Sequence, residues 1–229
     1  MAQAQVTDRG HPGEQSADDR RLPWVLELYR SAVGKKYVMA ITGIVWLGYV
    51  LAHMIGNLHL YQGAAEMNHY GEWLRELLQP AFPRTWFLWL LRSALIVSLV
   101  LHVHAAWSLT VMNRKARPTT YQSKRDYIAA DFAARTMRWT GVIVLLFVGY
   151  HLADLTWGVQ PAAPEAWTRG APYQNVVSSL ERWPVAIFYL LANLALGVHL
   201  YHGAWSLFQS LGVNNRRFNH WRRMFAVGF

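Results

Sequence analysis

The stretch Trp86–Met112, WFLWLLRSALIVSLVLHVHAAWSLTVM, decides the predicted fold, because Arg92 is its single charged residue. A helix of this length, at 1.5 Å per residue, is long enough to cross a hydrocarbon layer of about 30 Å. The stretch is apolar on every side, as in Ala94–Leu101, whereas a helix of a soluble bundle carries a polar outer face with a 3.6-residue period. It therefore predicts a membrane-spanning helix.

Three other stretches have the same character, and together they set the class of the protein. The chain is 53% hydrophobic and only 15% charged, where about a quarter is usual for a soluble domain. We therefore predict an all-α fold, a polytopic transmembrane helix bundle with spans at about 37–61, 86–112, 139–159 and 184–211. The final residues MFAVGF predict the first turn of a fifth span, starting or truncated at the C-terminus.

The distribution of Lys and Arg predicts the orientation of the spans. Six lie before Tyr37, seven lie between Arg114 and Arg138, and four follow Leu211, whereas the two other loops hold two each. Because cytoplasmic loops carry the excess of basic residues, the N-terminus, the middle loop and the C-terminus are expected in the cytoplasm of a bacterial-type membrane. The net charge of +9 is then a consequence of topology, and nucleic acid is not an expected partner.

The segments outside the spans complete the predicted organisation. Residues 1–30 form a cytoplasmic N-terminal segment, polar and disordered over 1–22 with a short interfacial helix over 22–30, and residues 31–229 form the anchor domain. Residues 63–84 predict a helix on the outer surface that Pro80 stops. The proline-rich residues 160–172 predict an outer loop.

Four histidines, one in each span, recur at regular spacing, at positions 53, 102, 151 and 199. Helix rise places His53 and His151 about 10 to 12 Å below the outer end of their helices, and His102 and His199 about 23 Å below it. The four therefore form an outer pair, His53 with His151, and an inner pair, His102 with His199, separated by about 12 Å.

Two opposed imidazoles at one depth match the ligands of a six-coordinate haem, so the pairs predict up to two bis-histidine haems b. The alternative without a cofactor is that these histidines only form hydrogen bonds between helices. A Rieske-type [2Fe–2S] centre is a second cofactor alternative; because the chain has no cysteine, a partner would have to supply its thiolates. His104 points about 200° away from His102 and is expected to contact a neighbouring helix instead.

Five motifs carry a family resemblance: SAVGKKYVMAITG, HMIGNLHLYQG, LHVHAAWSLTVMNRKARP, MRWTGVIVLLFVGYHL and HLYHGAWSLFQSLGVN, which begin at positions 31, 53, 101, 137 and 199. Together they resemble the fused, single-subunit cytochrome b membrane anchor of succinate dehydrogenase and fumarate reductase, respiratory complex II. The resemblance implies a five-helix anchor that docks flavoprotein and iron–sulfur subunits on the cytoplasmic side. It also implies a quinone site, and b haems at His53, His102, His151 and His199.

Quinone needs an apolar slot with a few polar donors. The candidates on the cytoplasmic side are Ser31, Lys35, Lys36 and Tyr37, and for the two lysines the alternative is a contact with lipid phosphates. An outer site near Tyr61, Glu66 and His69 is also open. Arg92, about 15 Å from His102 along the helix, needs an acidic partner or carbonyls, and a haem propionate suits it.

The predicted function is the membrane-anchor subunit of a succinate:quinone oxidoreductase, which passes electrons from a partner iron–sulfur subunit to membrane quinone. As an enzyme it acts only as part of that complex, because no residue suits succinate or flavin. The alternative is a b-type cytochrome subunit of another membrane oxidoreductase, of the hydrogenase or formate dehydrogenase type. A transporter would show interrupted helices and repeated mid-span glycines, and we expect neither here.

Overall fold

The computed structural model describes residues 23–116, 132–213 and 215–229, and every regular element among them is helical. Four of the helices are long and apolar enough to cross a membrane: Ala32–Gln62, Trp86–Lys115, Thr136–Trp157 and Trp183–Ser210. These four match the predicted spans, and the all-α fold of an integral membrane protein is confirmed. The stretch 1–22, predicted to be disordered, lies outside the described residues.

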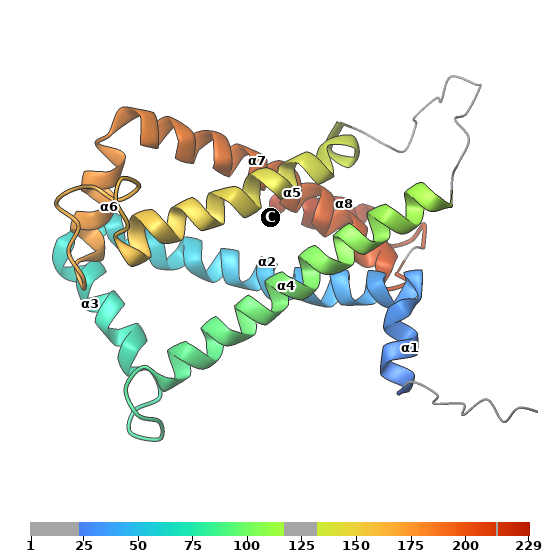
Figure 1. The fold of residues 1–229 in the computed structure, drawn as a ribbon, viewed down its shortest axis with the longest axis horizontal. Helices are drawn as coiled ribbons and strands as arrows, with labels where there is room; N and C mark the ends of the chain where they lie inside the picture. The colour runs from blue at the N-terminus through green and yellow to red at the C-terminus, as the bar shows by residue number, and fades with distance from the viewer. Residues whose placement is uncertain (1–22, 117–131, 214) are drawn as a thin grey trace, which may run out of the picture.

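The long helices run side by side, and the short ones gather at the two ends of the bundle (Figure 1). Helices α3 and α6 lie at one end, and α1 and α8 lie towards the other. Helix α2 packs on α4 and α7, and α5 packs on α7. The elements, in chain order, are α1 (Trp24–Arg30), α2 (Ala32–Asn57), the 3-10 turn η1 (Leu58–Gln62), α3 (Ala64–Glu76), α4 (Trp86–Lys115), α5 (Phe132–His151), the π-helical segment η2 (Leu152–Trp157), α6 (Pro172–Leu180), α7 (Trp183–Ser210) and α8 (Asn219–Gly228).

Local signals set several of these boundaries. Ser31 caps α2, since its hydroxyl accepts a hydrogen bond from the backbone N–H of Gly34 at 2.9 Å. Gly63 has φ 102°, a left-handed conformation that glycine adopts without strain, and it separates η1 from α3. Pro172 starts α6 in its first turn, where a missing N–H costs nothing.

Three boundaries differ from the sequence predictions. Helix α3 ends at Glu76, before Pro80, because the chain turns through Leu78 at φ 66°. The loop expected over 160–172 gives way at Pro172 to α6, a helix that the sequence analysis did not predict. The C-terminal apolar residues belong to α8, whose ten residues fall short of the roughly 20 needed for a span. The fifth span therefore stays a prediction.

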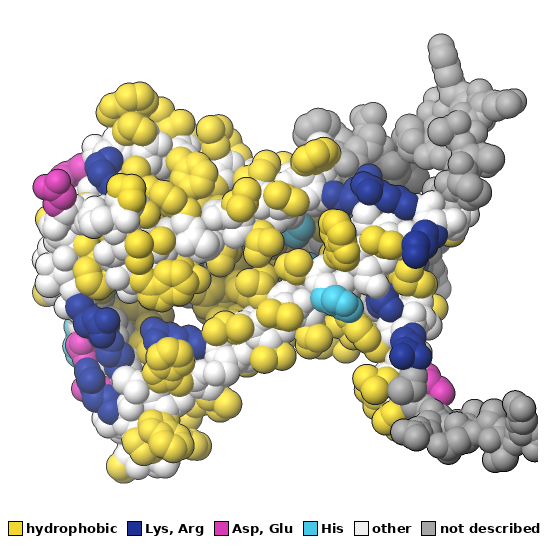
Figure 2. Space-filling view, viewed as in Figure 1, with side chains coloured by type: hydrophobic (Ala, Val, Ile, Leu, Met, Phe, Trp, Pro, Cys, Tyr) yellow, Lys and Arg dark blue, Asp and Glu magenta, His cyan; other side chains and the backbone are white. Residues whose placement is uncertain are grey.

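The helices meet through few buried apolar residues. Ala40, Leu47 and Leu207 form one buried cluster between α2 and α7, and the other fully enclosed apolar positions in the spans are mostly alanines, such as Ala105, Ala192 and Ala204. Small residues let helix backbones approach closely, as is usual in membrane bundles. Many large apolar side chains point outward, and hydrophobic atoms cover most of the middle of the face in Figure 2.

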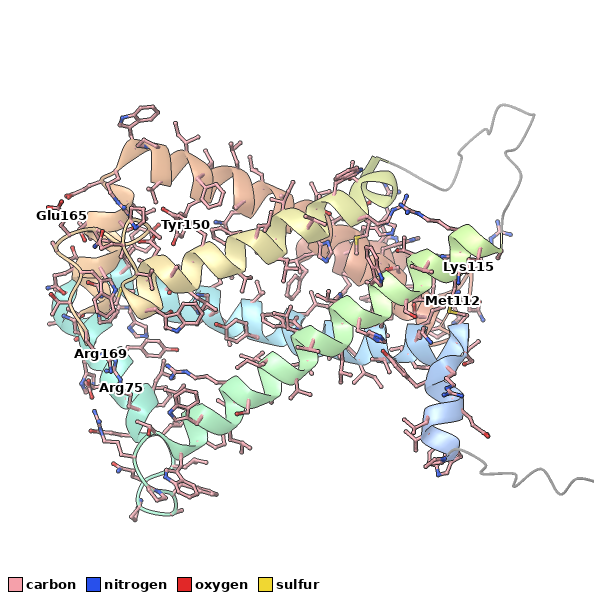
Figure 3. The ribbon with its side chains drawn as sticks, viewed as in Figure 1. Arg75, Met112, Lys115, Tyr150, Glu165 and Arg169 are labelled. Carbon is pink, nitrogen blue, oxygen red and sulfur yellow. The ribbon has the colours of Figure 1, made fainter. Side chains whose placement is uncertain are left out.

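Charged residues mark the ends of the bundle. Lys and Arg gather at both ends of the face in Figure 2 and leave its middle to hydrophobic atoms, apart from a hollow where histidine side chains are visible. Figure 3 shows Arg75, Glu165 and Arg169 at the α3/α6 end, and Met112 and Lys115 at the opposite end.

Candidate functional site

The outer pair lies between α2 and α5. The ring centres of His53 and His151 are 5.8 Å apart, and their planes are at 88°. An aromatic residue one turn earlier on the same helix supports each ring. Tyr49 stacks on His53 at 5.4 Å, and Phe147 contacts His151 at 5.7 Å. The two imidazoles thus come from separate helices and meet edge to face.

Each histidine of the inner pair is anchored by a threonine on a neighbouring helix. His102 Nδ1, on α4, lies 2.9 Å from Thr42 Oγ1 on α2. His199 Nδ1, on α7, lies 3.3 Å from Thr140 Oγ1 on α5. Both threonines are buried, so the hydroxyls fix how the imidazoles are turned within the bundle.

These threonines also favour one tautomer of each imidazole. Thr42 Oγ1 lies 2.7 Å from the Val38 carbonyl and Thr140 Oγ1 lies 3.1 Å from the Met137 carbonyl, so each hydroxyl has a backbone acceptor in its own helix. When the hydroxyl donates there, its oxygen can accept from the histidine, with the proton on Nδ1. This leaves the lone pair of Nε2 available, the form in which imidazole binds a metal.

The two halves of the bundle repeat this arrangement. Thr42, Gly43 and His53 on α2 recur 98 positions later as Thr140, Gly141 and His151 on α5. This threonine–glycine repeat is present in the sequence but was not among the sequence predictions.

The repeated glycines lie against the inner pair. A Cβ added at Gly141 would come within 3.3 Å of His199 Cε1, and one at Gly43 would lie 4.0 Å from His102 Cε1. Glycine is the residue that lets a backbone approach another group this closely. A glycine after Thr140 therefore leaves room for the His199 ring, whereas a Cβ after Thr42 would only make an ordinary contact with His102.

Two observations fit the binding of a haem iron by these histidine pairs. Two imidazoles that bind one metal ion from opposite sides, through metal–nitrogen bonds of about 2 Å, have ring centres about 6 Å apart. The 5.8 Å of the outer pair agrees with this. Trp46 Nε1 is also buried without a hydrogen-bond partner, on the turns of α2 between Thr42 and His53. A buried N–H of this kind is costly unless something accepts from it.

The site offers histidines in pairs. Among the described residues, no group of three or more His, Asp or Glu side chains could hold a metal ion. A haem needs only two axial ligands from the protein, because the macrocycle supplies the rest.

A polar network lies next to His151, and sequence reasoning did not find it. Asp154 is fully buried on η2, and its carboxylate accepts from Arg182 at 3.0 Å, Ser179 at 2.5 Å and Tyr189 at 2.8 Å. The Tyr189 hydroxyl also lies 3.4 Å from Nδ1 of His151. A lone acidic residue one turn after His151, in an otherwise apolar stretch, is the signal that points to it.

Comparisons with known proteins found no relative of this chain. No family model, curated protein or solved structure matches the chain.

The residues predicted for a quinone site lie near one another at the start of α2. Ser31 caps this helix, and Lys35, although buried, donates to the carbonyls of Tyr29 and Arg30 at 2.8 and 3.0 Å. Lys36 and Tyr37 are exposed. Ser31 and Lys35 thus hold α1 against α2 through backbone groups.

With α1 held against α2 in this way, Tyr29 lies next to His104. The Tyr29 hydroxyl lies 2.5 Å from His104 Nδ1, their rings stack at 5.8 Å, and Lys35 Nζ lies 4.9 Å from the centre of the tyrosine ring. His104 therefore contacts a neighbouring helix, as predicted. It is also the one titratable residue of an open groove of about 410 Å³, lined by Leu99, Val100, Val103, His104, Trp107 and Leu145.

Arg92 and the outer alternative residues are placed differently. The Arg92 guanidinium lies over the ring of Trp89 at 5.1 Å, one turn earlier on α4. Tyr61, Glu66 and His69 are all exposed at the α3 end of the bundle. His59 stacks on Tyr70 at 4.5 Å, and its Nδ1 is buried.

Proposed function

We propose that this chain is the haem b membrane anchor of a succinate:quinone oxidoreductase and passes electrons from a partner iron–sulfur subunit to membrane quinone. One observation carries the proposal: the rings of His53 and His151, which come from two spans, meet edge to face with their centres 5.8 Å apart. The sequence resemblance to complex II anchors supports the assignment to this enzyme.

The chain's own residues prepare the ligands. Thr42 and Thr140 offer a hydrogen-bond acceptor to Nδ1 of His102 and His199, and Gly141 leaves space beside the His199 ring. Bound haem b supplies a one-electron carrier whose potential its ligands tune. In the membrane, lipid around the apolar helices would keep water away from the imidazoles, which preserves the neutral ligand form.

The quinone site belongs at the α1 end of the bundle in this proposal. The groove beside His104 offers an apolar wall for a ring and isoprenoid tail, and the Tyr29–His104 pair offers a proton to a quinone oxygen. Ser31 and Lys35 act indirectly by holding α1 in place, and Lys36 and Tyr37 stand at the exposed edge.

The partners follow from the chemistry that this chain lacks. Succinate oxidation needs flavin and iron–sulfur centres, so the proposal includes flavoprotein and iron–sulfur subunits bound at the cytoplasmic end of the bundle. Membrane lipid surrounds the exposed apolar faces. The alternative is a b-type cytochrome of a hydrogenase or formate dehydrogenase complex, which the same histidine pairs would serve.

A spectrum of the purified complex tests the cofactor. Reduction with dithionite is expected to give an absorption α-band in the haem b region, and identification of the copurified subunits separates succinate dehydrogenase from the alternative complexes. A complex without that band contradicts the haem proposal. An iron–sulfur signal in electron paramagnetic resonance, assigned to histidine-ligated iron, would favour the Rieske-type centre.

A double variant tests the electron path. Succinate-dependent quinone reduction is expected to fall at least about a hundredfold in His102→Ala/His199→Ala, in line with the loss of metal ligands. His69→Ala, at an exposed position of α3, is the matched control. Activity that survives the double substitution removes the inner pair from the mechanism.

A further inference from the structure

Asp154 is a buried acidic residue that the proposed electron path does not yet use. It lies in a span and is fully enclosed, where an unpaired carboxylate would cost several kcal/mol. Arg182 supplies the counter-charge at 3.0 Å, and Ser179 and Tyr189 donate to the other oxygen. The carboxylate is therefore held in one orientation by three groups from α6, α7 and the turn that joins them.

Tyr189 connects this carboxylate to the outer pair. Its hydroxyl proton is directed to Asp154 Oδ2 at 2.8 Å, so the phenol oxygen faces His151 Nδ1, 3.4 Å away, as an acceptor. The proton between them then belongs to Nδ1, and Nε2 of His151 keeps its lone pair. Carboxylate support of this kind makes an imidazole a stronger donor to a metal.

The other half of the repeat lacks this support. Position 56, which matches Asp154 at the 98-residue offset, is a glycine, and an added Cβ there would come 2.6 Å from the Tyr70 hydroxyl. Position 91, which matches Tyr189 at the 98-residue offset, is a leucine. Position 92, which matches it at the 97-residue offset between His102 and His199, is an arginine. His53 has the stacked ring of Tyr49 as its neighbour. The outer pair is thus supported by a carboxylate on one side.

We propose that Tyr189 and Asp154 are positioning residues that fix the proton on Nδ1 of His151 and strengthen its Nε2 as a ligand. The proposal rests on the proposed function, since it concerns the cofactor that the outer pair would hold. A stronger donor stabilises the oxidised iron more than the reduced iron. The Asp154–Tyr189 pair therefore keeps the potential of the outer haem low.

Tyr189→Phe in the whole complex is the primary test, because it removes the bridging hydroxyl and keeps the ring that packs on Phe147. Redox titration is expected to show one haem shifted towards the reduced form by up to about tenfold, or 59 mV for one electron. Haem retention during detergent washing is expected to fall about tenfold. Tyr150→Phe is the control, since that hydroxyl donates to the Ala162 carbonyl instead (Figure 3).

Asp154→Asn gives a second route to the same result, because it removes the charge and keeps the shape. It is expected to shift the same haem in the same direction. A reducible haem band with unchanged potential and retention in both variants overturns this proposal and leaves the proposed function standing. A wild-type complex without any haem band overturns both.

Discussion

Each inner histidine has a threonine hydroxyl of the adjacent helix within hydrogen-bond distance of its Nδ1. Thr42 and Thr140 also have backbone acceptors in their own helices, an arrangement that favours the tautomer with the proton on Nδ1. Metal-binding histidines usually have such a partner, and its loss weakens the site. The threonines are therefore as much a part of the site as the histidines.

Thr42→Val tests that role, since valine keeps the shape and loses the oxygen. The unpaired Nδ1–H of His102 is expected to cost about 1–3 kcal/mol of stability, and haem retention is expected to fall. Thermal unfolding in detergent and haem content measure the two effects. Thr110→Val is the control, because that hydroxyl bonds only to the Ala106 carbonyl of its own helix. Equal effects at both positions would argue against an anchoring role.

The two repeated glycines predict unequal effects of alanine. Gly141→Ala is expected to displace His199 by a few tenths of an ångström and lower haem retention, since its Cβ would lie 3.3 Å from the ring. Gly43→Ala is expected to leave retention unchanged and to stabilise α2 by about 1 kcal/mol through helix propensity. Haem content and melting temperature separate the outcomes, and equal haem loss in both contradicts the prediction.

At the scale of elements, the corner between α3 and α4 is held by one carboxylate. Glu72 forms salt bridges with Arg75 of its own helix and with Arg84 of the connection to α4. The hydrogen bond from Arg84 holds the pKa of Glu72 below its ordinary 4.5. Because the folded-state pKa is the lower one, the pair stabilises the corner above pH 4.5 and loses that effect as the pH falls further.

Glu72→Gln is therefore expected to lower the melting temperature slightly at pH 7. The difference from wild type should shrink below pH 4.5, because the wild-type carboxylate becomes protonated there. Melting curves from pH 7 to 3.5 measure this, with Glu76→Gln as the control for a pair separated by 4.0 Å. A difference that stays constant across this range would contradict the linkage.

At the scale of the whole molecule, the histidine pairs join the two halves of the repeat. Contacts between α2 and α7 include one small apolar cluster, so a ligand held between His53 and His151 adds a second connection. A group that binds only the folded state stabilises it by about 4 kcal/mol at a thousand times its dissociation constant.

Removal of haem is therefore expected to loosen the entire bundle. Protein from haem-deficient cells should melt at a lower temperature and be cut faster by protease than protein from supplemented cells. His53→Ala/His151→Ala should behave like the haem-deficient protein under both growth conditions. An unchanged melting temperature after haem depletion would show that the cofactor does not connect the halves.

The sequence by itself determined the four spans and the depth of their histidines. Both follow from local properties, since apolar runs of more than 20 residues must cross the bilayer and helix rise fixes where His53 or His199 lies along the span. The sequence also contained the threonine–glycine repeat, which emerged only when the structure showed what Thr42 and Thr140 contact.

Only the tertiary structure decided which group meets each nitrogen. The rotation and packing of neighbouring helices set the contact of Thr42 with His102, 60 positions apart, and these are long-range properties. The Asp154 network depends on α6 and the start of α7, which bring Ser179, Arg182 and Tyr189 to one buried carboxylate. Residue spacing along a helix sets the position of a ligand along the span, and packing between helices sets which group contacts it.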